Sequence, residues 1–542
     1  MSVPATGVQQ RRSVPDRAER IEILDTTLRD GAQSEHISYS IEDKIEIAQE
    51  LDRLGVDYIE CGFPGGNPKD RAFLKRALKL DWKHARLTAF SSTRHASKPA
   101  PEDPGLKALV DSEAPVAAVV GKSWDFHVTH ALRVGLSDNL DMIRSSLAFL
   151  KGRCREVLYD AEHFFDGYLA EPDYACRTLE AALAGGADAL VLCDTNGGTL
   201  PGDIARIVGE VKRRFGSARL GIHPHNDAGV AVANALAAVE AGCTHVQGTI
   251  NGLGERCGNV DLVPVVASLQ LKLGYQCLRG RDSLRRLTEA SRFIYEVCNL
   301  PLRDNQPYVG ASAFAHKGGM HVSAVAREAQ TYEHVDPDTV GNTRRVLISE
   351  LSGRSSLLVK QGERFGLNDD PAAMRKVLDR IRELEDQGYA FEAADASFEL
   401  LVRRTLKRDK PFFRFHRFKV VNQAAEHGHP LSEATVKVEV GGQVEHTAAE
   451  GNGPVHALDR ALRKALEPFF PELKDVVLAD YKVRVVNPRA ATAAKVLVSI
   501  VSSDHRSRWT TVGVSENIIE ASWLALVDSV EYKLYQTRGA GQ

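Results

Sequence analysis

Short apolar runs alternate with longer amphipathic stretches between residues 21 and 275 of this chain. Eight of the runs have the length and composition of buried strands, and they read IEILDTT, VDYIECGF, ARLTAFS, PVAAVVG, REVLYDAEH, DALVLCDT, ARLGIHPH and THVQGTI. The stretches between them, such as SIEDKIEIAQELDRLG, repeat apolar residues every three or four positions, as amphipathic helices do. Several stretches end at a glycine just before the next strand, where helices commonly stop.

This alternation predicts an α/β fold. Eight strand–helix units in succession match the (β/α)8 TIM barrel in number, and their total of about 250 residues matches its usual length. A doubly wound parallel sheet is the alternative, but it usually has fewer strands and a glycine-rich first turn. No GxGxxG motif follows the first strand, so we favour the barrel.

The pattern changes twice after the barrel. Residues 276–412 contain helical stretches such as DSLRRLTEASRFIYEVCNL and a longer one over residues 370–406, with GASAFAHKGGMHVSAV between them. From residue 413 onward, three alternating strands and a helix occur twice, which predicts an α+β domain of two βββα repeats. We therefore expect a disordered tail (1–20), the barrel (21–290), a helical linker (291–412) and the C-terminal domain (413–542).

Composition narrows the functional classes. The chain has 542 residues, too many for one hydrophobic core, and its formal net charge of -3 without a basic block gives nucleic-acid binding no electrostatic support. No apolar run approaches the roughly 20 residues of a membrane span, and the N-terminus lacks the apolar core of a signal peptide. All eight cysteines precede residue 299 and none forms a CxxC pair. We therefore expect a cytoplasmic protein without a disulfide framework.

Polar residues cluster at the ends of the predicted strands, where TIM barrels place their chemistry. His223 and His225 are two positions apart on one strand, so their imidazoles point to the same side. Asp30 follows the first strand, and Asn259 lies in the loop NGLGERCGN after the eighth. Two nitrogens and two oxygens suit Mg, Mn, Co or Zn, and open positions would let the cation polarise a substrate carbonyl. The alternatives are a chance or hydrogen-bonded histidine pair and an ordinary glycine turn.

Arg29 directly precedes Asp30 in the run IEILDTTLRDGAQ. Its permanently charged, fork-shaped guanidinium suits a substrate carboxylate or an oxyanion that develops beside a cation. An arginine that pairs with Glu60 and caps the barrel is the structural alternative. The two roles are compatible, because an acid that orients the arginine also supports its chemistry.

Five motifs in order along the barrel resemble the family of metal-dependent Claisen-type acyltransferases and lyases: LDTTLRDGAQ, YIECGFPG, CDTNGG, HPHND and NGLGERCGN. Further on, HKGGMHVSAV, TYEHVDPDTVGN and RRVLISELSGRS resemble its synthase branch, the 2-isopropylmalate synthase and homocitrate synthase family, and within it the citramalate-forming enzymes most closely. The resemblance spans residues 21–535. It implies an acyltransferase that joins acetyl-CoA to a 2-oxo acid with a divalent metal cation as cofactor.

The same resemblance implies roles for individual residues. The implied metal ligands are Asp30, His223, His225 and Asn259. Arg29 would polarise the 2-oxo acid with Glu60 as its partner, and the hydroxyl of Thr195 would hold the oxo-acid carboxylate. Glu162 would be an active-site acid, and His321 with Tyr332 would form a pair that helps to deprotonate acetyl-CoA, often from the partner subunit. Asp160, two positions before Glu162, should face the same way and contact the substrate. Its charge departs from the apolar or aromatic wall expected beside pyruvate.

The implied reaction joins acetyl-CoA, pyruvate and water to give (R)-citramalate and CoA, on the route to isoleucine. A base removes a proton from the acetyl methyl group, the carbanion attacks the oxo carbon, and water then cleaves the thioester. His321 is our first choice of base, since histidine commonly has this role, and Glu162 is the alternative. Because one methyl group discriminates by only about 1–3 kcal/mol, 2-oxoisovalerate and 2-oxoglutarate remain alternative substrates.

The C-terminal repeats resemble the regulatory domain of the same synthases, which implies isoleucine as an effector and a homodimer. Simple dimer packing is the alternative. Two other activities stay open, namely a lyase or aldolase that splits a hydroxyacyl substrate and an inactive barrel that carries an amino-acid sensor. Lyases of the superfamily use a cysteine after the eighth strand, and Cys257 lies close to that place. We expect Cys257 to be a buried structural thiol instead.

Overall fold

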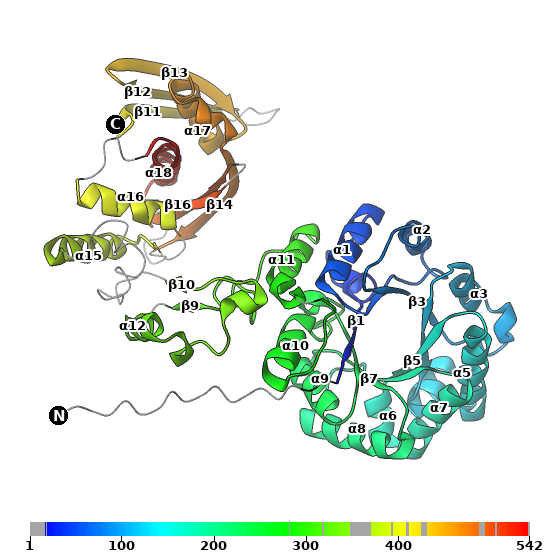
Figure 1. Cartoon of the computed structure of the whole chain (residues 1–542). Coiled ribbons are helices and arrows are strands. Elements are labelled where there is room, and N and C mark those ends of the chain that lie inside the picture. Colours follow the sequence, from blue (N-terminus) through cyan, green and yellow to red (C-terminus); the bar gives the residue numbers. More distant parts are fainter. Residues whose placement is uncertain are drawn as a thin grey trace, which may run out of the picture. The chain divides into compact units, whose positions relative to one another are not determined.

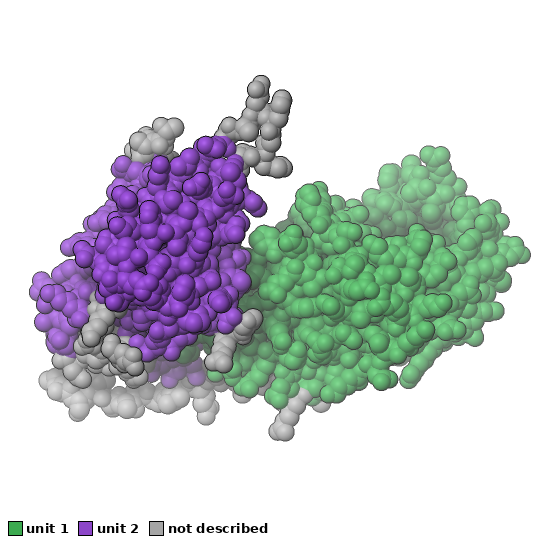
Figure 2. Space-filling model, turned by 90° about the horizontal axis from the view of Figure 1, so that it is seen from above, with its two compact units in different colours: residues 1–314, 335–344 green, residues 315–334, 345–542 purple. Residues whose placement is uncertain are grey.

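The computed structural model describes residues 17, 19–280, 282–316, 319–346, 370–391, 394–407, 411–423, 431–486, 494–504 and 507–539. Most of the predicted tail and most of the motif RRVLISELSGRS lie outside the described residues. The chain divides into two compact units, residues 1–314 with 335–344 and residues 315–334 with 345–542 (Figure 2). No helix of the described residues is long and apolar enough to cross a membrane.

Unit 1 contains a closed barrel of eight parallel strands, which confirms the predicted fold (Figure 1). Each strand pairs with the next one along the chain, and the eighth pairs with the first. The strands are β1 (Glu22–Asp25), β2 (Tyr58–Glu60), β3 (Arg86–Ser92), β4 (Val116–Lys122), β5 (Glu156–Glu162), β6 (Ala189–Asp194), β7 (Leu220–Pro224) and β8 (His245–Gly248).

Helices surround the barrel and cover its outer face (Figure 1). They are α1 (Ile41–Leu54), α2 (Pro68–Ala77), α3 (Pro104–Asp111), α4 (Asp125–His127), α5 (Leu136–Lys151), α6 (Phe164–Ala170), α7 (Pro172–Ala184), α8 (Pro201–Phe215), α9 (Ala231–Glu240), α10 (Leu262–Ser268) and α11 (Leu287–Val297). In α8 the buried residues are Ile204, Ile207, Val208 and Val211, which form one stripe of a helix with 3.6 residues per turn. This stripe explains why α8 packs on the barrel.

The barrel interior is filled in layers, because alternate residues of each strand point inward. One apolar layer consists of Leu24, Tyr58, Val116, Leu158 and Ala189, all fully buried. Two positions further along β1, β2 and β5, the buried residues are polar, namely Thr26, Glu60 and Asp160. The barrel is therefore closed by an apolar layer below a polar mouth at the carboxyl ends of the strands.

Unit 2 begins with short elements and then forms two three-stranded antiparallel sheets, each with one helix (Figure 1). The elements before the sheets are the short β9 (Ala315–His316), α12 (Gly319–Arg327) and β10 (Arg345–Val346), followed by the longer helices α15 (Pro371–Asp386) and α16 (Asp395–Thr405). The first repeat is β11 (Arg414–Gln423), β12 (Leu431–Val440), β13 (Gln443–Gly451) and α17 (Pro454–Leu466). The second is β14 (Val477–Val485), β15 (Val496–Ser503), β16 (Arg508–Ser515) and α18 (Ile518–Arg538). The predicted pair of βββα repeats is confirmed.

The two repeats share one core. Along β12, buried and more exposed residues alternate, and Val436 and Val438 of its buried face belong to the same cluster as Leu458 of α17 and Leu526 of α18. The helical stretch that we expected over residues 370–406 is instead divided into α15 and α16. Gly388, with φ of +103°, ends the first helix, since this backbone conformation is unfavourable for residues with a side chain.

Candidate active site

Arg29 is held between two acids at the end of β1. Its Nε donates to Oε2 of Glu60 at 2.6 Å, and its Nη1 pairs with Oδ1 of Asp30. The ring of Phe90 lies 4.1 Å below the guanidinium carbon. Burial opposes the charge of Arg29, but Asp30 and Glu60 outweigh this effect and raise its pKa further. In the described part of the chain, Nη2 of Arg29 has no hydrogen-bond acceptor, so this nitrogen can serve a substrate.

A cavity of about 510 Å³ opens beside Arg29. Leu28, Gln33, Phe63 and Phe90 also line it. Its volume is sufficient for a small 2-oxo acid. The predicted pairing of Arg29 with Glu60 is present. None of the predicted metal ligands lines this cavity, so the role of Arg29 toward a substrate stays a prediction.

His223 lies at the centre of a buried hydrogen-bond chain. Its Nδ1 is 2.7 Å from Oε1 of Gln247, and Nε2 of Gln247 donates to Oδ1 of Asp160 at 3.0 Å. Since Asp160 accepts the amide N–H, the amide oxygen of Gln247 faces His223 and offers an acceptor to a proton on Nδ1. In the tautomer with the proton on Nδ1, the lone pair lies on Nε2, the nitrogen that faces Asn259 and Asp30.

Nε2 of His223 faces two oxygens. Oδ1 of Asn259 is 2.9 Å away and Oδ2 of Asp30 is 3.4 Å away. Nδ2 of Asn259 donates to the carbonyl of Leu253 at 3.1 Å, which fixes the amide oxygen toward His223. Without a proton on Nε2, these three atoms would be electron-pair donors that face one point, and a cation would replace the hydrogen that they otherwise share.

His225 provides the fourth predicted donor. Its ring lies 5.4 Å from that of His223, and its Nδ1 is buried without a hydrogen-bond partner among the described residues. Burial, followed by the neighbouring His223, lowers the pKa of His225 to about 4. Burial would raise the pKa of Asp30, but Arg29, then His223 and His225, lower it below its ordinary value. Together the four side chains offer one carboxylate, two imidazoles and the amide oxygen of Asn259.

These donors are not arranged as a finished cage. Within the described residues, no group of three or more His, Cys, Asp or Glu side chains could hold a metal ion as it stands. The side chains are instead engaged with each other, as the contact between His223 and Asn259 shows. The donor chemistry fits a divalent cation, and binding would require small side-chain movements away from these mutual contacts.

Three further predicted residues lie on β5 and after β6. Glu162 forms an ion pair with Lys122 of β4, and Oγ1 of Thr195 accepts a hydrogen bond from the backbone N–H of His163 at 2.9 Å. Asp160 is buried behind Gln247, and burial, followed by the charge of Glu60, raises its pKa to about 7.

The sequence analysis missed an aromatic group at the same strand ends. The ring of His127 lies 4.0 Å from that of His163 and 5.2 Å from that of Trp124. Burial, followed by the charge of His163, lowers the pKa of His127. The run SWDFHVTH, in which four aromatic or imidazole side chains follow a strand, was an available signal. Gln247 was also missed, although a glutamine inside the apolar run THVQGTI is unusual for a buried strand.

His321 and Tyr332 belong to unit 2, not to the unit that contains the barrel. Their rings stack on each other with centroids 4.0 Å apart and planes 27° apart. The two predicted residues are therefore in contact, although one comes from α12 and the other from the turn after it. Their role in proton transfer stays a prediction.

The prediction for Cys257 was wrong, because this cysteine is exposed. It lies in the turn between Arg256, with φ of +56°, and Gly258, with φ of +86°. Arg256 is tied back to Asp227 at 2.8 Å. The turn is thus held on both sides of Cys257, and its thiol faces solvent.

Gly258 sets the path of the loop that carries Asn259. A β-carbon at this position would be 1.9 Å from the carbonyl oxygen of Gly252, in addition to the unfavourable positive φ. We expect Gly258→Ala to lower the free energy of unfolding by about 2–4 kcal/mol, as measured by urea denaturation. Gly229→Ala is the control, because Gly229 also has a positive φ of +72°, but a β-carbon at its position would meet no atom within 4 Å. Its replacement should therefore lower the free energy of unfolding by only about 1–2 kcal/mol. Equal losses in the two variants would contradict this explanation.

Three family models match consecutive parts of the chain. The HMGL-like model matches residues 20–294, the homocitrate synthase post-HMGL domain-like model matches residues 308–389, and the LeuA allosteric (dimerisation) domain matches residues 392–534. The (R)-citramalate synthase of Aquifex aeolicus is 53% identical, covering 97% of this chain and 99% of that protein. The (R)-citramalate synthase of Geobacter sulfurreducens is 54% identical, covering 95% and 98%. The chain belongs to the (R)-citramalate synthase family.

The sister synthases are more distant from this family member. The probable 2-isopropylmalate synthase of Methanopyrus kandleri is 30% identical, covering 94% of this chain and 98% of that protein. The predicted membership of the (R)-citramalate synthase family and the predicted acyltransferase class are therefore confirmed. Because the matches extend over almost the whole chain, they include both units and not the barrel alone.

Proposed function

We propose that the protein condenses acetyl-CoA with pyruvate and water to form (R)-citramalate and CoA, as a step toward isoleucine. One observation carries the choice of pyruvate. Five (R)-citramalate synthases are 45–54% identical to the chain over nearly its full length, whereas the 2-isopropylmalate synthases are 29–30% identical. The intracellular location stays a prediction from cysteine usage.

Residues at the barrel mouth bind and orient the oxo acid. Asp30, His223, His225 and Asn259 would hold a divalent cation, which when bound supplies Lewis-acid polarisation of the oxo group. Nη2 of Arg29 donates a hydrogen bond to the oxo oxygen and stabilises the negative charge that develops there. Asp30 and Glu60 fix the guanidinium, so this stabilisation needs no reorganisation during the reaction.

The hydroxyl of Thr195 holds the carboxylate of pyruvate in this proposal. That hydroxyl already accepts the N–H of His163, so its own hydrogen is available to a carboxylate oxygen. A base then removes a proton from the acetyl methyl group of acetyl-CoA, and the resulting carbanion forms the new carbon–carbon bond. His321, stacked on Tyr332, is the proposed base, and Glu162 with its partner Lys122 is the alternative. Water finally cleaves the thioester and releases CoA.

The C-terminal repeats have a regulatory role in this proposal. The model that matches them describes an allosteric and dimerisation domain, which supports a homodimer whose activity responds to a small effector. Isoleucine is the effector that fits the proposed pathway. The identity of the cation among Mg, Mn, Co and Zn is left open by the donor set.

The test is a comparison of three oxo acids in an assay of free CoA release. After chelation and dialysis, each divalent cation is added back with acetyl-CoA and pyruvate, 2-oxoisovalerate or 2-oxoglutarate. We expect kcat/KM for pyruvate to exceed the other two by at least about tenfold, since a pocket wall discriminates by about 1–3 kcal/mol for each methyl group. Activity should disappear on chelation and return with metal. A preference for 2-oxoisovalerate would assign the chain to the sister activity.

A further inference from the structure

Two buried side chains of β8 connect the polar mouth of the barrel with its opposite end. His245 and Gln247 are two positions apart, so they lie on the same face of the strand, and both are fully buried. Nε2 of His245 lies 3.5 Å from Nε2 of Gln247, whose amide also contacts His223 at 2.7 Å and Asp160 at 3.0 Å. Nδ1 of His245 faces the other way and lies 3.9 Å from Oε2 of Glu22, its neighbour on β1. A row of polar groups therefore runs through the barrel from Glu22 to His223.

This row can be hydrogen-bonded in two directions. In the first, the amide nitrogen of Gln247 donates to Asp160 and to Nε2 of His245, and the amide oxygen accepts a proton from Nδ1 of the other histidine, His223. In the second, the amide is turned over, so its oxygen accepts protons from Asp160 and His245. Only the first direction leaves Nε2 of His223 with a lone pair for a cation. Asp160 alone does not choose between them, because a carboxyl group accepts when ionised and donates when protonated.

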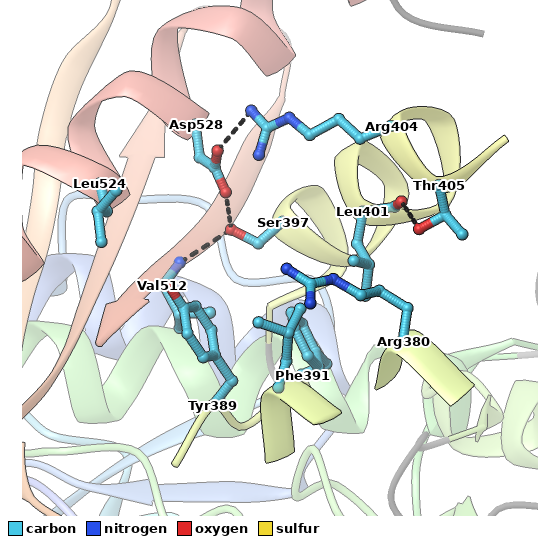
Figure 3. A pocket seen from close by; sticks show the side chains of 11 residues that line it. Arg380, Tyr389, Phe391, Ser397, Leu401, Arg404, Thr405, Val512, Leu524 and Asp528 are labelled. Carbon is cyan, nitrogen blue, oxygen red and sulfur yellow. Dashed lines mark hydrogen bonds and ion pairs between the residues drawn. The ribbon is translucent and has the colours of Figure 1, made fainter. Parts of the chain in front are cut away.

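A chain of hydrogen bonds has a fixed direction when its end groups can only donate or only accept. Unit 2 contains such a chain beside a cavity (Figure 3). Arg404 can only donate, and it donates to Asp528 at 2.8 Å, while the backbone N–H of Val512 donates to the hydroxyl of another residue, Ser397, at 3.0 Å. The hydroxyl hydrogen of Ser397 is therefore left for Asp528, 2.6 Å away. Along the row in the barrel the imidazoles can donate or accept, so its direction must come from the end group, Glu22.

Glu22 is an acceptor that is held in its ionised form. Its Oε2 pairs with Arg219 at 2.8 Å, and its Oε1 lies 3.4 Å from Nη2 of Arg86. Burial opposes the negative charge, but His245, followed by the two arginines, lowers the pKa of Glu22 to about 2. At 3.9 Å the carboxylate acts on Nδ1 of His245 through its charge, and among the described residues this nitrogen has no hydrogen-bond partner that would favour the other tautomer. With the proton on Nδ1, Nε2 of His245 can only accept, and the amide nitrogen of Gln247 is the donor that faces it.

We propose that Glu22 and His245 are positioning residues for the cation site at the barrel mouth. The charge of Glu22 selects the His245 tautomer with the proton on Nδ1. His245 then fixes the amide of Gln247, and the amide oxygen holds the proton of His223 on Nδ1. Nε2 of His223 is thereby left free for a divalent cation, although Glu22 lies at the opposite end of the barrel. This inference rests on the proposed function, because His223 is a metal ligand of that proposal.

The first experiment compares wild type with His245→Phe and His245→Gln as metal-free, full-length protein labelled with ¹⁵N-histidine. Phenylalanine fills a similar volume but offers no acceptor to Gln247, so the His223 signal, identified by its absence in His223→Ala, should shift toward the Nε2-protonated form. Affinity for Mn²⁺, measured from the electron paramagnetic resonance of the free ion, should fall by about tenfold, the lower end of the effect of outer partners of metal-binding histidines. Glutamine can place an amide oxygen near the position of Nε2, so His245→Gln should keep the affinity within about threefold of wild type.

The second experiment uses Glu22→Gln, with Glu156→Gln as the matched control. Glu156 has the same charge and pairs with the same two arginines, Arg86 at 2.5 Å and Arg219, but in the described part of the chain it forms no hydrogen bond or ion pair with His245. Glu22→Gln should shift the His245 signal, identified by its absence in His245→Phe, away from the Nδ1-protonated form and weaken Mn²⁺ binding at least about threefold. Glu156→Gln should change neither. Because Glu22 is partly exposed, this pair keeps the test decisive if His245→Phe does not fold.

Three results would overturn the proposal: a proton on Nε2 of His245 in wild type, an unchanged His223 signal in folded His245→Phe, or equal effects of Glu22→Gln and Glu156→Gln. These measurements contain neither acetyl-CoA nor an oxo acid. CoA release with the three oxo acids is measured in parallel, so a preference for 2-oxoisovalerate would refute the proposed substrate and leave this inference standing.

Discussion

Replacing His223 with alanine is expected to reduce kcat for CoA release by at least about a thousandfold and to reduce the bound divalent cation at equal metal concentration. The reason is geometric, since Nε2 of His223 is the point at which the oxygens of Asn259 and Asp30 converge. Loss of Lewis-acid stabilisation is worth several kcal/mol, and about 4 kcal/mol corresponds to that factor. Activity is measured by CoA release, and metal content by elemental analysis after gel filtration.

The control for this experiment is His446→Ala, because His446 is an exposed histidine of β13 in unit 2. Both variants are compared by circular dichroism and thermal unfolding in the absence of metal. His223 is buried, so some loss of stability is expected, but the barrel should remain folded. A His223→Ala protein with unchanged turnover and unchanged metal content would refute the metal assignment.

The barrel could be predicted from sequence because its pattern is local. Each strand is an apolar run that ends in polar residues, and each helix has its own stripe, as in α8, so the eight units can be recognised one at a time. The C-terminal repeats were recognisable for the same reason. The β9 and β10 pair could not be predicted, since strands of two residues, Ala315–His316 and Arg345–Val346, have no periodicity.

The site could be predicted only in part. The positions of polar residues at the strand ends supplied the candidate ligands, and the resemblance supported them; the structure places His223, Asn259 and Asp30 within hydrogen-bond or ion-pair distance. The partners of these residues depend on the register between neighbouring strands, which the sequence does not reveal. Lys122 meets Glu162 because β4 and β5 pair at these two residues, and no pattern within either strand indicates that pairing.

The contacts of Gln247, on β8, are another feature that no pattern within a single strand indicates. It is fully buried and connects Asp160 to His223, so we expect its amide oxygen to favour the tautomer of His223 with the proton on Nδ1. In Gln247→Leu, a change that nearly preserves volume, Nδ1 of His223 loses its acceptor and Nε2 is no longer kept free for a cation. Outer partners of metal-binding histidines are typically worth 10–100-fold in metal affinity, and we expect a loss in this range by calorimetry.

Asp160→Asn separates this orienting effect from a general loss of packing. An asparagine can still offer its oxygen to Nε2 of Gln247, so the amide keeps its orientation and metal affinity should change less than about threefold. In metal-free protein labelled with ¹⁵N-histidine, the His223 signal, identified by its absence in His223→Ala, should report a proton on Nδ1 in wild type and in Asp160→Asn. In Gln247→Leu it should shift toward the Nε2-protonated form. If Gln247→Leu alters neither the imidazole signal nor the metal affinity, the hydrogen-bond chain does not set the tautomer of His223 and does not prepare this histidine for a cation.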